Sequence, residues 1–293
     1  MCFAKIRRSD PVYQMQLQRP LTNRRVGKRA TGTTPEQSAR LTSGPMQLSR
    51  NRSWNRRVFA ILLFGVAFGY LEAAVVSYLR ALHEPVRQRY YPGRPPAELF
   101  PLLTLDQTRS AAPEQIRVIA VEVGREAATL VMLAALALGI SENAGQWAAA
   151  FAIAFGGWDL AFYAGLKLVL GWPPSPFTWD ILFLIPVPWA APVLAPALVA
   201  AAMIAAGIWH LQREAAGEPV RIAPRQWAGI VLAALILIVS FTLDYRNLLA
   251  GGRPHPFAWG TFSFGLALGL FSYAYAALMS RTGLKPAAAG VAA

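Results

Sequence analysis

Apolar residues fill six stretches of the chain, each long enough to cross a lipid bilayer as a helix. They cover residues 58–79, 118–140, 147–170, 189–209, 227–243 and 257–279. Charged residues crowd into the first 57 positions and the links between the stretches. The pattern predicts an all-α, polytopic transmembrane helical bundle of about six spans.

The region before the fourth span does not fit one straight helix. Residues 178–210 would make about 50 Å of helix, against a hydrocarbon core of about 30 Å. Prolines interrupt its first half, at Pro186, Pro188, Pro192 and Pro196. We therefore expect a proline-broken interfacial or re-entrant segment over 178–188 and the span itself over 189–209.

The two ends of the chain differ from the apolar centre. Residues 1–53 mix Arg, Gln, Ser, Thr, Pro and Gly without apolar periodicity, which predicts a disordered basic tail. Met46, just before the first span, is an alternative start. The membrane domain is expected over 54–280, followed by a short C-terminal tail over 281–293.

Charge and composition support the membrane class and suggest an orientation. The chain is 55% hydrophobic and 15% charged, with a net charge of +13, and 13 of its 28 Lys and Arg precede Val58. A basic segment directly before a first span is typical of a cytoplasmic side and of contact with lipid headgroups. We expect both termini in the cytoplasm, although the loop after the first span also carries six arginines. We expect membrane lipids as partners, and no nucleic acid.

Ionisable residues recur inside the apolar stretches, on shared helix faces. The first stretch carries Glu72; the others carry Glu122, Arg125, Glu126, Asp159, Tyr163 and Lys167, with Asp180 just beyond in the proline-broken segment. Because a charge in the bilayer centre costs about 2.5–3.5 kcal/mol on insertion scales, these side chains are expected to face one another or a water-filled cavity.

The acids outnumber the bases in this set, five to two. The excess favours an outward-facing acidic pocket in which carboxylates bind protons or cations, or act as acid and base. The alternative is that the charges pair and only hold the helices together. Trp179 either forms a wall of such a pocket or packs.

Several chemistries lack their sequence patterns. The only cysteine is Cys2, there is no HExxH, and no two of the three histidines share a span. No phosphate-binding glycine loop or GxSxG occurs. We therefore expect neither a metal nor another cofactor.

The run from GYLEAAVV through EVGREAATLVML and GGWDLAFYAGLK to TWDILFLIPVPW resembles uncharacterised bacterial polytopic inner-membrane proteins, over about residues 58–210. The resemblance implies a bacterial inner-membrane location and carries no activity.

Three functional hypotheses remain open from the sequence. The first is a transporter or channel-like component that binds a proton, cation or small polar solute. The second is a membrane-embedded enzyme for a lipid-linked substrate, with Arg87, Arg89 and Arg94 near a headgroup phosphate. The third is a non-catalytic subunit, either in a homo-oligomer or with a partner in a membrane complex.

Overall fold

The computed structural model describes residues 35–95, 97–111 and 114–282. The chain divides into two units, Met1–Gly44 and Pro45–Ala293, and apart from the beginning of α1 all described elements belong to the second. The helices are α1 (Pro35–Tyr90), α2 (Leu105–Ala111), α3 (Glu114–Gly139), α4 (Ala144–Leu170), α5 (Leu194–Ala215), α6 (Pro224–Thr242), α7 (Tyr245–Leu249) and α8 (Trp259–Thr282). Strands β1 (Trp179–Phe183) and β2 (Trp189–Pro192) form one antiparallel hairpin between α4 and α5.

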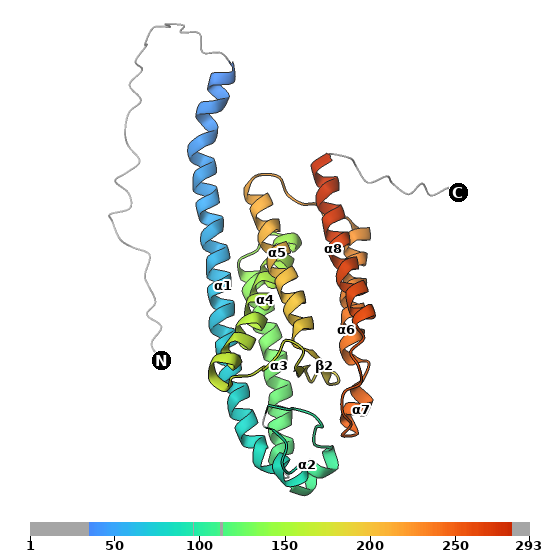
Figure 1. The fold of residues 1–293 in the computed structure, drawn as a ribbon. Coiled ribbons are helices and arrows are strands. Elements are labelled where there is room, and N and C mark those ends of the chain that lie inside the picture. Colours follow the sequence, from blue (N-terminus) through green and yellow to red (C-terminus); the bar gives the residue numbers. More distant parts are fainter. Residues whose placement is uncertain (1–34, 96, 112–113, 283–293) are drawn as a thin grey trace, which may run out of the picture. The chain divides into compact units, whose positions relative to one another are not determined.

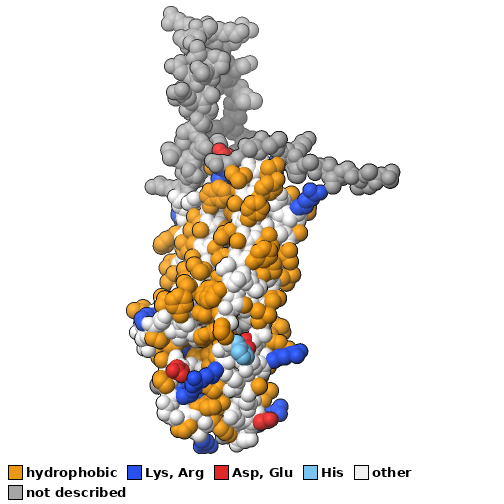
Figure 2. All heavy atoms as spheres, turned by 45° about the vertical axis from the view of Figure 1, so that its right-hand side comes forward, with side chains coloured by type: hydrophobic (Ala, Val, Ile, Leu, Met, Phe, Trp, Pro, Cys, Tyr) orange, Lys and Arg blue, Asp and Glu red, His pale blue; other side chains and the backbone are white. Residues whose placement is uncertain are grey.

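Five helical segments are long and apolar enough to cross a membrane, which supports a multi-pass membrane protein. They are Trp54–Tyr90, Ala144–Leu170, Leu194–Ala215, Pro224–Leu249 and Trp259–Ser280. Large hydrophobic side chains are exposed on them, and on the face in Figure 2 they cover the surface between charged groups near the ends. Helix α3 is not among the five and carries Glu122, Arg125 and Glu126, so the sixth span stays a prediction.

The long helices alternate in direction (Figure 1). Helices α1, α4 and α6 run toward one end of the second unit, and α3, α5 and α8 return. We call the first the hairpin end, where α4 ends at Leu170 and α5 begins at Leu194, and the opposite one the Trp54 end. The predicted tails lie outside the described residues over 1–34 and 283–293, while α1 begins at Pro35, inside the range predicted to be disordered.

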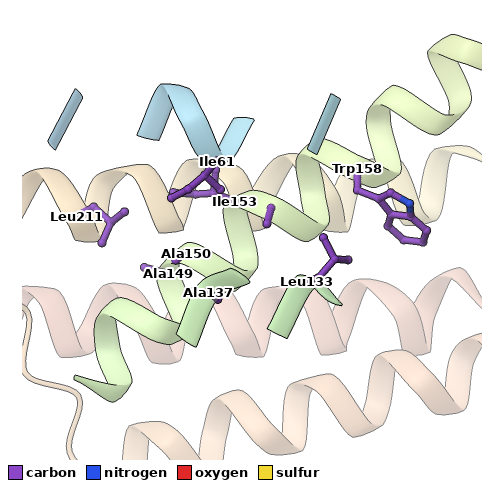
Figure 3. Close-up of a cluster of buried hydrophobic side chains, with 9 residues drawn as sticks. Ile61, Leu133, Ala137, Ala149, Ala150, Ile153, Trp158 and Leu211 are labelled. Carbon is purple, nitrogen blue, oxygen red and sulfur yellow. The ribbon is translucent and has the colours of Figure 1, made fainter. Parts of the chain in front are cut away.

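Helix α4 packs closely against α1 and α5. An added Cβ at Gly69 of α1 would lie 2.7 Å from the Cβ of Ala161 in α4, and one at Gly207 of α5 would lie 2.7 Å from Ile153 Cγ1. Small residues permit this close approach of helix backbones in a membrane protein. The buried cluster in Figure 3 includes Ile61 of α1, Ile153 of α4 and Leu211 of α5.

The proline-broken segment is a β-hairpin, so the all-α prediction is wrong for residues 179–192. The register pairs Trp179 with Pro192 and Asp180 with Ala191. Prolines remove backbone donors and favour extended conformations before them, and the flanking aromatic residues favour strands. The following helix therefore begins at Leu194 instead of residue 189.

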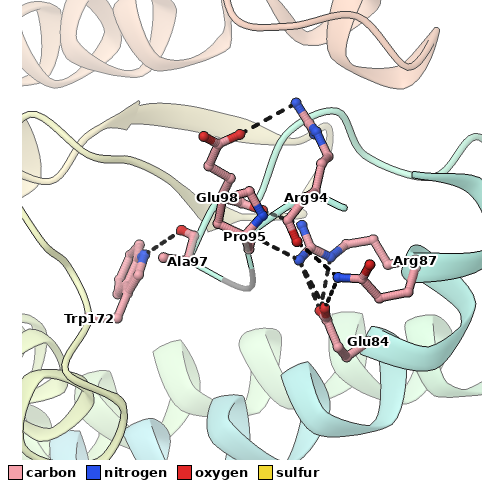
Figure 4. Close-up of polar contacts among 8 residues, drawn as sticks. Glu84, Arg87, Arg94, Pro95, Ala97, Glu98 and Trp172 are labelled. Carbon is pink, nitrogen blue, oxygen red and sulfur yellow. Dashed lines mark hydrogen bonds and ion pairs between the residues drawn. The ribbon is translucent and has the colours of Figure 1, made fainter. Parts of the chain in front are cut away.

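Helix α1 continues past its predicted end at residue 79 to Tyr90, so the first part of the predicted loop is helical. Its last turns hold the next segment (Figure 4). Arg87 donates to Glu84 at 3.0 Å and to the carbonyl of Pro95 at 3.2 Å. The Trp172 indole donates to the carbonyl of Ala97 at 3.0 Å, which joins this segment to the end of α4.

We predict that Gly69→Ala lowers the stability of the protein. The new methyl group would collide with the backbone and Ala161 of α4, and overpacking of this kind costs about 1–3 kcal/mol. Thermal unfolding in detergent measures the change. Gly124→Ala is the matched control, because nothing lies within 4 Å of a Cβ there. Equal melting temperatures for the two variants would contradict the close α1–α4 contact.

Candidate functional site

A buried aspartate ties the hairpin to two helices. Asp180 of β1 is 3% exposed. Its Oδ2 accepts a hydrogen bond from the Tyr163 hydroxyl of α4 at 3.1 Å, and its Oδ1 lies 3.7 Å from a guanidinium nitrogen of Arg80 in α1. The carboxylate thus has a donor on one oxygen and a positive charge beside the other, which is what a buried carboxylate requires.

Arg80 is itself held in place by an aromatic ring. Its guanidinium carbon lies 3.9 Å from the ring centroid of Trp172, a cation–π distance. Trp172 is 2% exposed and is fixed by its hydrogen bond to Ala97. The position of the positive charge beside Asp180 is therefore set by α1 and the loop after α4 together.

The turn of the hairpin reaches a second acid. The backbone N–H of Leu184 donates to Glu126 Oε2 of α3 at 2.8 Å, and Glu126 is 7% exposed. The preceding Phe183 packs against Trp158 of α4, with ring centroids 6.1 Å apart. Glu126 thus satisfies a backbone donor that follows the end of β1.

Arg125, the neighbour of Glu126, bridges two further carboxylates. It forms ion pairs with Glu122 on its own helix and with Glu72 on α1, and its Nε lies 2.9 Å from Glu122 Oε2. Glu72 is 7% exposed. We call Glu72, Glu122, Arg125 and Glu126 the glutamate cluster.

Asp159 lies one helical turn before Tyr163 on α4. Its Oδ2 is buried and has no hydrogen-bond partner among the described residues, and it lies within electrostatic range of Asp180. We call Arg80, Asp159, Tyr163 and Asp180 the aspartate cluster. Strand β1 and its turn connect this cluster to the glutamate cluster, through Asp180 and Leu184.

Two of the residues nominated from the sequence lie apart from both clusters. Lys167 is exposed and donates to the carbonyls of Gly171 and Pro173 at the end of α4, at 3.2 and 2.9 Å. Trp179 packs against Phe100 and Phe257, with ring centroids 6.4 and 6.0 Å apart. Lys167 therefore caps the C-terminal end of α4, where a positive charge is favourable. Trp179 has a packing role against other aromatic rings.

Arg80 and Trp172 were missed by the sequence analysis. Arg80 was placed at the start of a loop because α1 was expected to end at residue 79. A signal was present, since Arg80 follows Glu72 by eight residues and two steps of i+4 put both on one helix face. Nothing in the sequence pattern brings Trp172 to Arg80.

Burial raises the pKa of Asp180 to about 6, although Arg80 and the Tyr163 hydroxyl favour its ionised form. The carboxyl group therefore reaches half protonation near pH 6 and is mostly ionised at neutral pH. Among the described residues, no group of three or more His, Cys, Asp and Glu side chains is placed to hold a metal ion.

Comparisons with known proteins add nothing to this geometry. No family model, no curated protein and no solved structure matches the chain. The chain's own contacts therefore have to indicate its function.

We predict that Arg80→Gln destabilises the protein by about 3 kcal/mol at pH 8, because it leaves the buried Asp180 carboxylate without its counter-charge. At pH 5, below the pKa of about 6, Asp180 takes up a proton and the loss should shrink. Thermal unfolding in detergent at the two pH values measures both effects.

Two variants make this test specific. Arg80→Gln combined with Asp180→Asn should recover most of the lost stability, since the uncompensated charge is gone. Arg109→Gln removes one partner of an exposed pair with Asp106, at 4.0 Å, and should change stability by less than about 0.5 kcal/mol. A pH-independent loss in Arg80→Gln, with no recovery in the double variant, would refute the pairing.

Proposed function

We propose that this chain is a proton-binding multi-pass membrane protein that moves protons, alone or coupled to a solute, through its two carboxylate clusters. The observation that carries the proposal is the imbalance of charge. The clusters hold five carboxyl groups, of Glu72, Glu122, Glu126, Asp159 and Asp180, against the two guanidinium groups of Arg80 and Arg125.

Full ionisation of this set would be costly inside an apolar bundle. His83 lies within electrostatic range of Glu122, and even with that imidazole protonated the acids outnumber the bases five to three. If these charges only held the helices together, equal numbers of acidic and basic groups would be sufficient. Unmatched carboxyl groups at such depth are instead suited to carrying protons, the usual role of intramembrane acids in pumps and transporters.

Asp159 is the central proton carrier in this proposal. Its buried Oδ2 has no hydrogen-bond partner among the described residues. By contrast, Asp180 accepts a hydrogen bond from Tyr163, and Glu126 accepts one from Leu184. A carboxyl group without a fixed donor can take up and release a proton without breaking a protein contact. Asp180 and Tyr163, one turn further toward the hairpin end, would provide the next acceptor.

The proposed placement in the membrane makes α3 the sixth span and the hairpin a re-entrant segment. Phe183 packs on Trp158 and Phe155, which precede the end of α4 at Leu170 by 12–15 residues, or about 18–22 Å along the helix. That depth is more than half of a hydrocarbon core of about 30 Å. We place the hairpin end outside and both termini in the cytoplasm of a bacterial inner membrane.

The enzyme hypothesis receives less support. It used Arg125, Lys167 and the loop arginines to hold a phosphate. Arg125 is paired within the glutamate cluster and Lys167 donates to two backbone carbonyls. Arg87 and Arg94 contact acids of their own segment, and Arg87 also donates to backbone carbonyls. These contacts order the segment after α1. A subunit role, in a homo-oligomer or a membrane complex, has no specific observation in its favour.

Proton flux into liposomes tests the proposal. Purified protein is reconstituted with a pH-sensitive dye inside, and a potassium diffusion potential drives protons inward. Asp159→Asn should lower the protein-dependent flux at least tenfold, because it removes the proposed carrier while keeping the shape of the side chain. Asp106→Asn, at a side chain that is 94% exposed, should leave the flux unchanged.

Infrared spectroscopy separates a binding role from a folding role. Wild type should show a protonated-carboxyl band at neutral pH that Asp159→Asn weakens, while the melting temperature of the variant stays within a few degrees of wild type. Unchanged proton flux and an unchanged protonated-carboxyl band in a folded Asp159→Asn protein would contradict the proposal.

A further inference from the structure

A pocket of about 450 Å³ lies at the Trp54 end, opposite the hairpin end. It is lined from α1, α4, α5 and the links beside them, by Trp54, Arg57, Glu142, Gln146, Glu214, Gly217 and Pro219. The volume lies within the range of small-ligand sites. Gly217 has a positive φ of 83°, which lets the link after α5 turn back beside the pocket.

The pocket is lined by a cation, Arg57, and by an acid, Glu142, that are not paired with each other in a salt bridge. Arg57 stacks on the Trp54 ring at 4.9 Å, and among the described residues neither Arg57 nor Glu142 has a salt bridge within 4.0 Å. The side chain of Glu214 accepts a hydrogen bond from Asn143 at 3.2 Å. A cation on one wall and carboxylates on another are complementary to a ligand that itself carries both charges.

The pocket also holds a buried amide. Gln146 is 6% exposed, and its amide oxygen accepts the backbone N–H of Glu142 at 2.9 Å, so its NH₂ group remains as a donor. Trp54 is the first residue of the part of α1 that is apolar enough to cross a membrane, and Pro219 follows the end of another such helix, α5. Interfacial tryptophans sit at the level of lipid headgroups, so the pocket opens where headgroups are found.

We propose that this pocket binds a phosphoethanolamine group. Arg57 and the Gln146 amide would donate to the phosphate, which accepts charge-assisted hydrogen bonds readily from arginine. Glu142 and Glu214 would accept hydrogen bonds from the primary ammonium. This site is distinct from the two carboxylate clusters and does not depend on proton transport.

The wall chemistry discriminates between headgroups. Choline has no N–H to donate to the two carboxylates, and sites for it use several aromatic faces, whereas this pocket has one indole that Arg57 already covers. Phosphoglycerol has no positive charge, so Glu142 and Glu214 would repel its phosphate. A primary ammonium linked to a phosphate satisfies both walls.

Lipid retention in native mass spectrometry tests the proposal. Protein is exchanged into detergent with phosphatidylethanolamine, phosphatidylcholine or phosphatidylglycerol, and bound lipid is counted. Wild type should retain phosphatidylethanolamine preferentially. Arg57→Gln and Glu142→Gln should each weaken that retention about tenfold, the effect expected for the loss of one charged hydrogen bond.

The controls change the same charges outside the pocket. Arg56→Gln is next to Arg57 and Glu218→Gln is next to Gly217, but neither residue lines the pocket, so both variants should retain lipid as wild type does. Equal retention of all three lipids, or unchanged retention in Arg57→Gln and Glu142→Gln, would overturn the proposal.

Phosphoethanolamine can reach the pocket as a lipid headgroup or as a soluble compound, and a soluble ligand distinguishes the two. Glycerophosphoethanolamine without acyl chains is added to the protein, and the melting temperature is measured. A rise that Glu142→Gln abolishes would support phosphoethanolamine recognition from solution. No rise, together with selective retention of the lipid, would support the same recognition with the membrane as its source.

Discussion

The structure depends on hydrogen-bond partners for the backbone of a β-hairpin that lies within a helical bundle. A helix satisfies its own backbone, but the turn after β1 leaves donors that must find partners in the protein. Glu126 accepts the Leu184 N–H, and Asp180 anchors the other end of the strand to Tyr163 and Arg80. Two of the five acids, Glu126 and Asp180, are therefore tied to the element that interrupts the helical pattern.

Close helix packing makes these anchors possible. The glycines of α1, among them Gly69, let its backbone approach α4, so that Arg80 and Tyr163 come to the same carboxylate from two different helices. A larger residue at Gly69 would separate the helices and draw Arg80 away from Asp180. We therefore expect the small residues in the apolar part of α1 to help set the distance between Arg80 and Asp180.

The apolar stretches were sufficient to locate the long helices, since hydrophobic length does not depend on tertiary contacts. The third stretch, predicted over 147–170, is α4 at Ala144–Leu170. The hairpin was not predictable from periodicity, because four strand residues flanked by prolines resemble a broken helix. The face shared by Glu72 and Arg80 was present in the sequence, but the stacking of Arg80 on Trp172 arises only from the fold. The charged set was therefore predicted with Arg125 and Lys167 as its bases, but without Arg80, which pairs with Asp180.

The two ends of the unit use charge in opposite ways. At the hairpin end, carboxyl groups are buried beside one another, so the free energy of ionisation depends on how many carry a proton. At the Trp54 end, Arg57 and Glu142 line an open pocket and have no salt bridge within 4.0 Å among the described residues, so their charges are available to a ligand. In our proposals, the same residue types would exchange protons where they are buried in the bundle and would bind a headgroup where they line an open pocket. Burial, not residue identity, distinguishes the two sites.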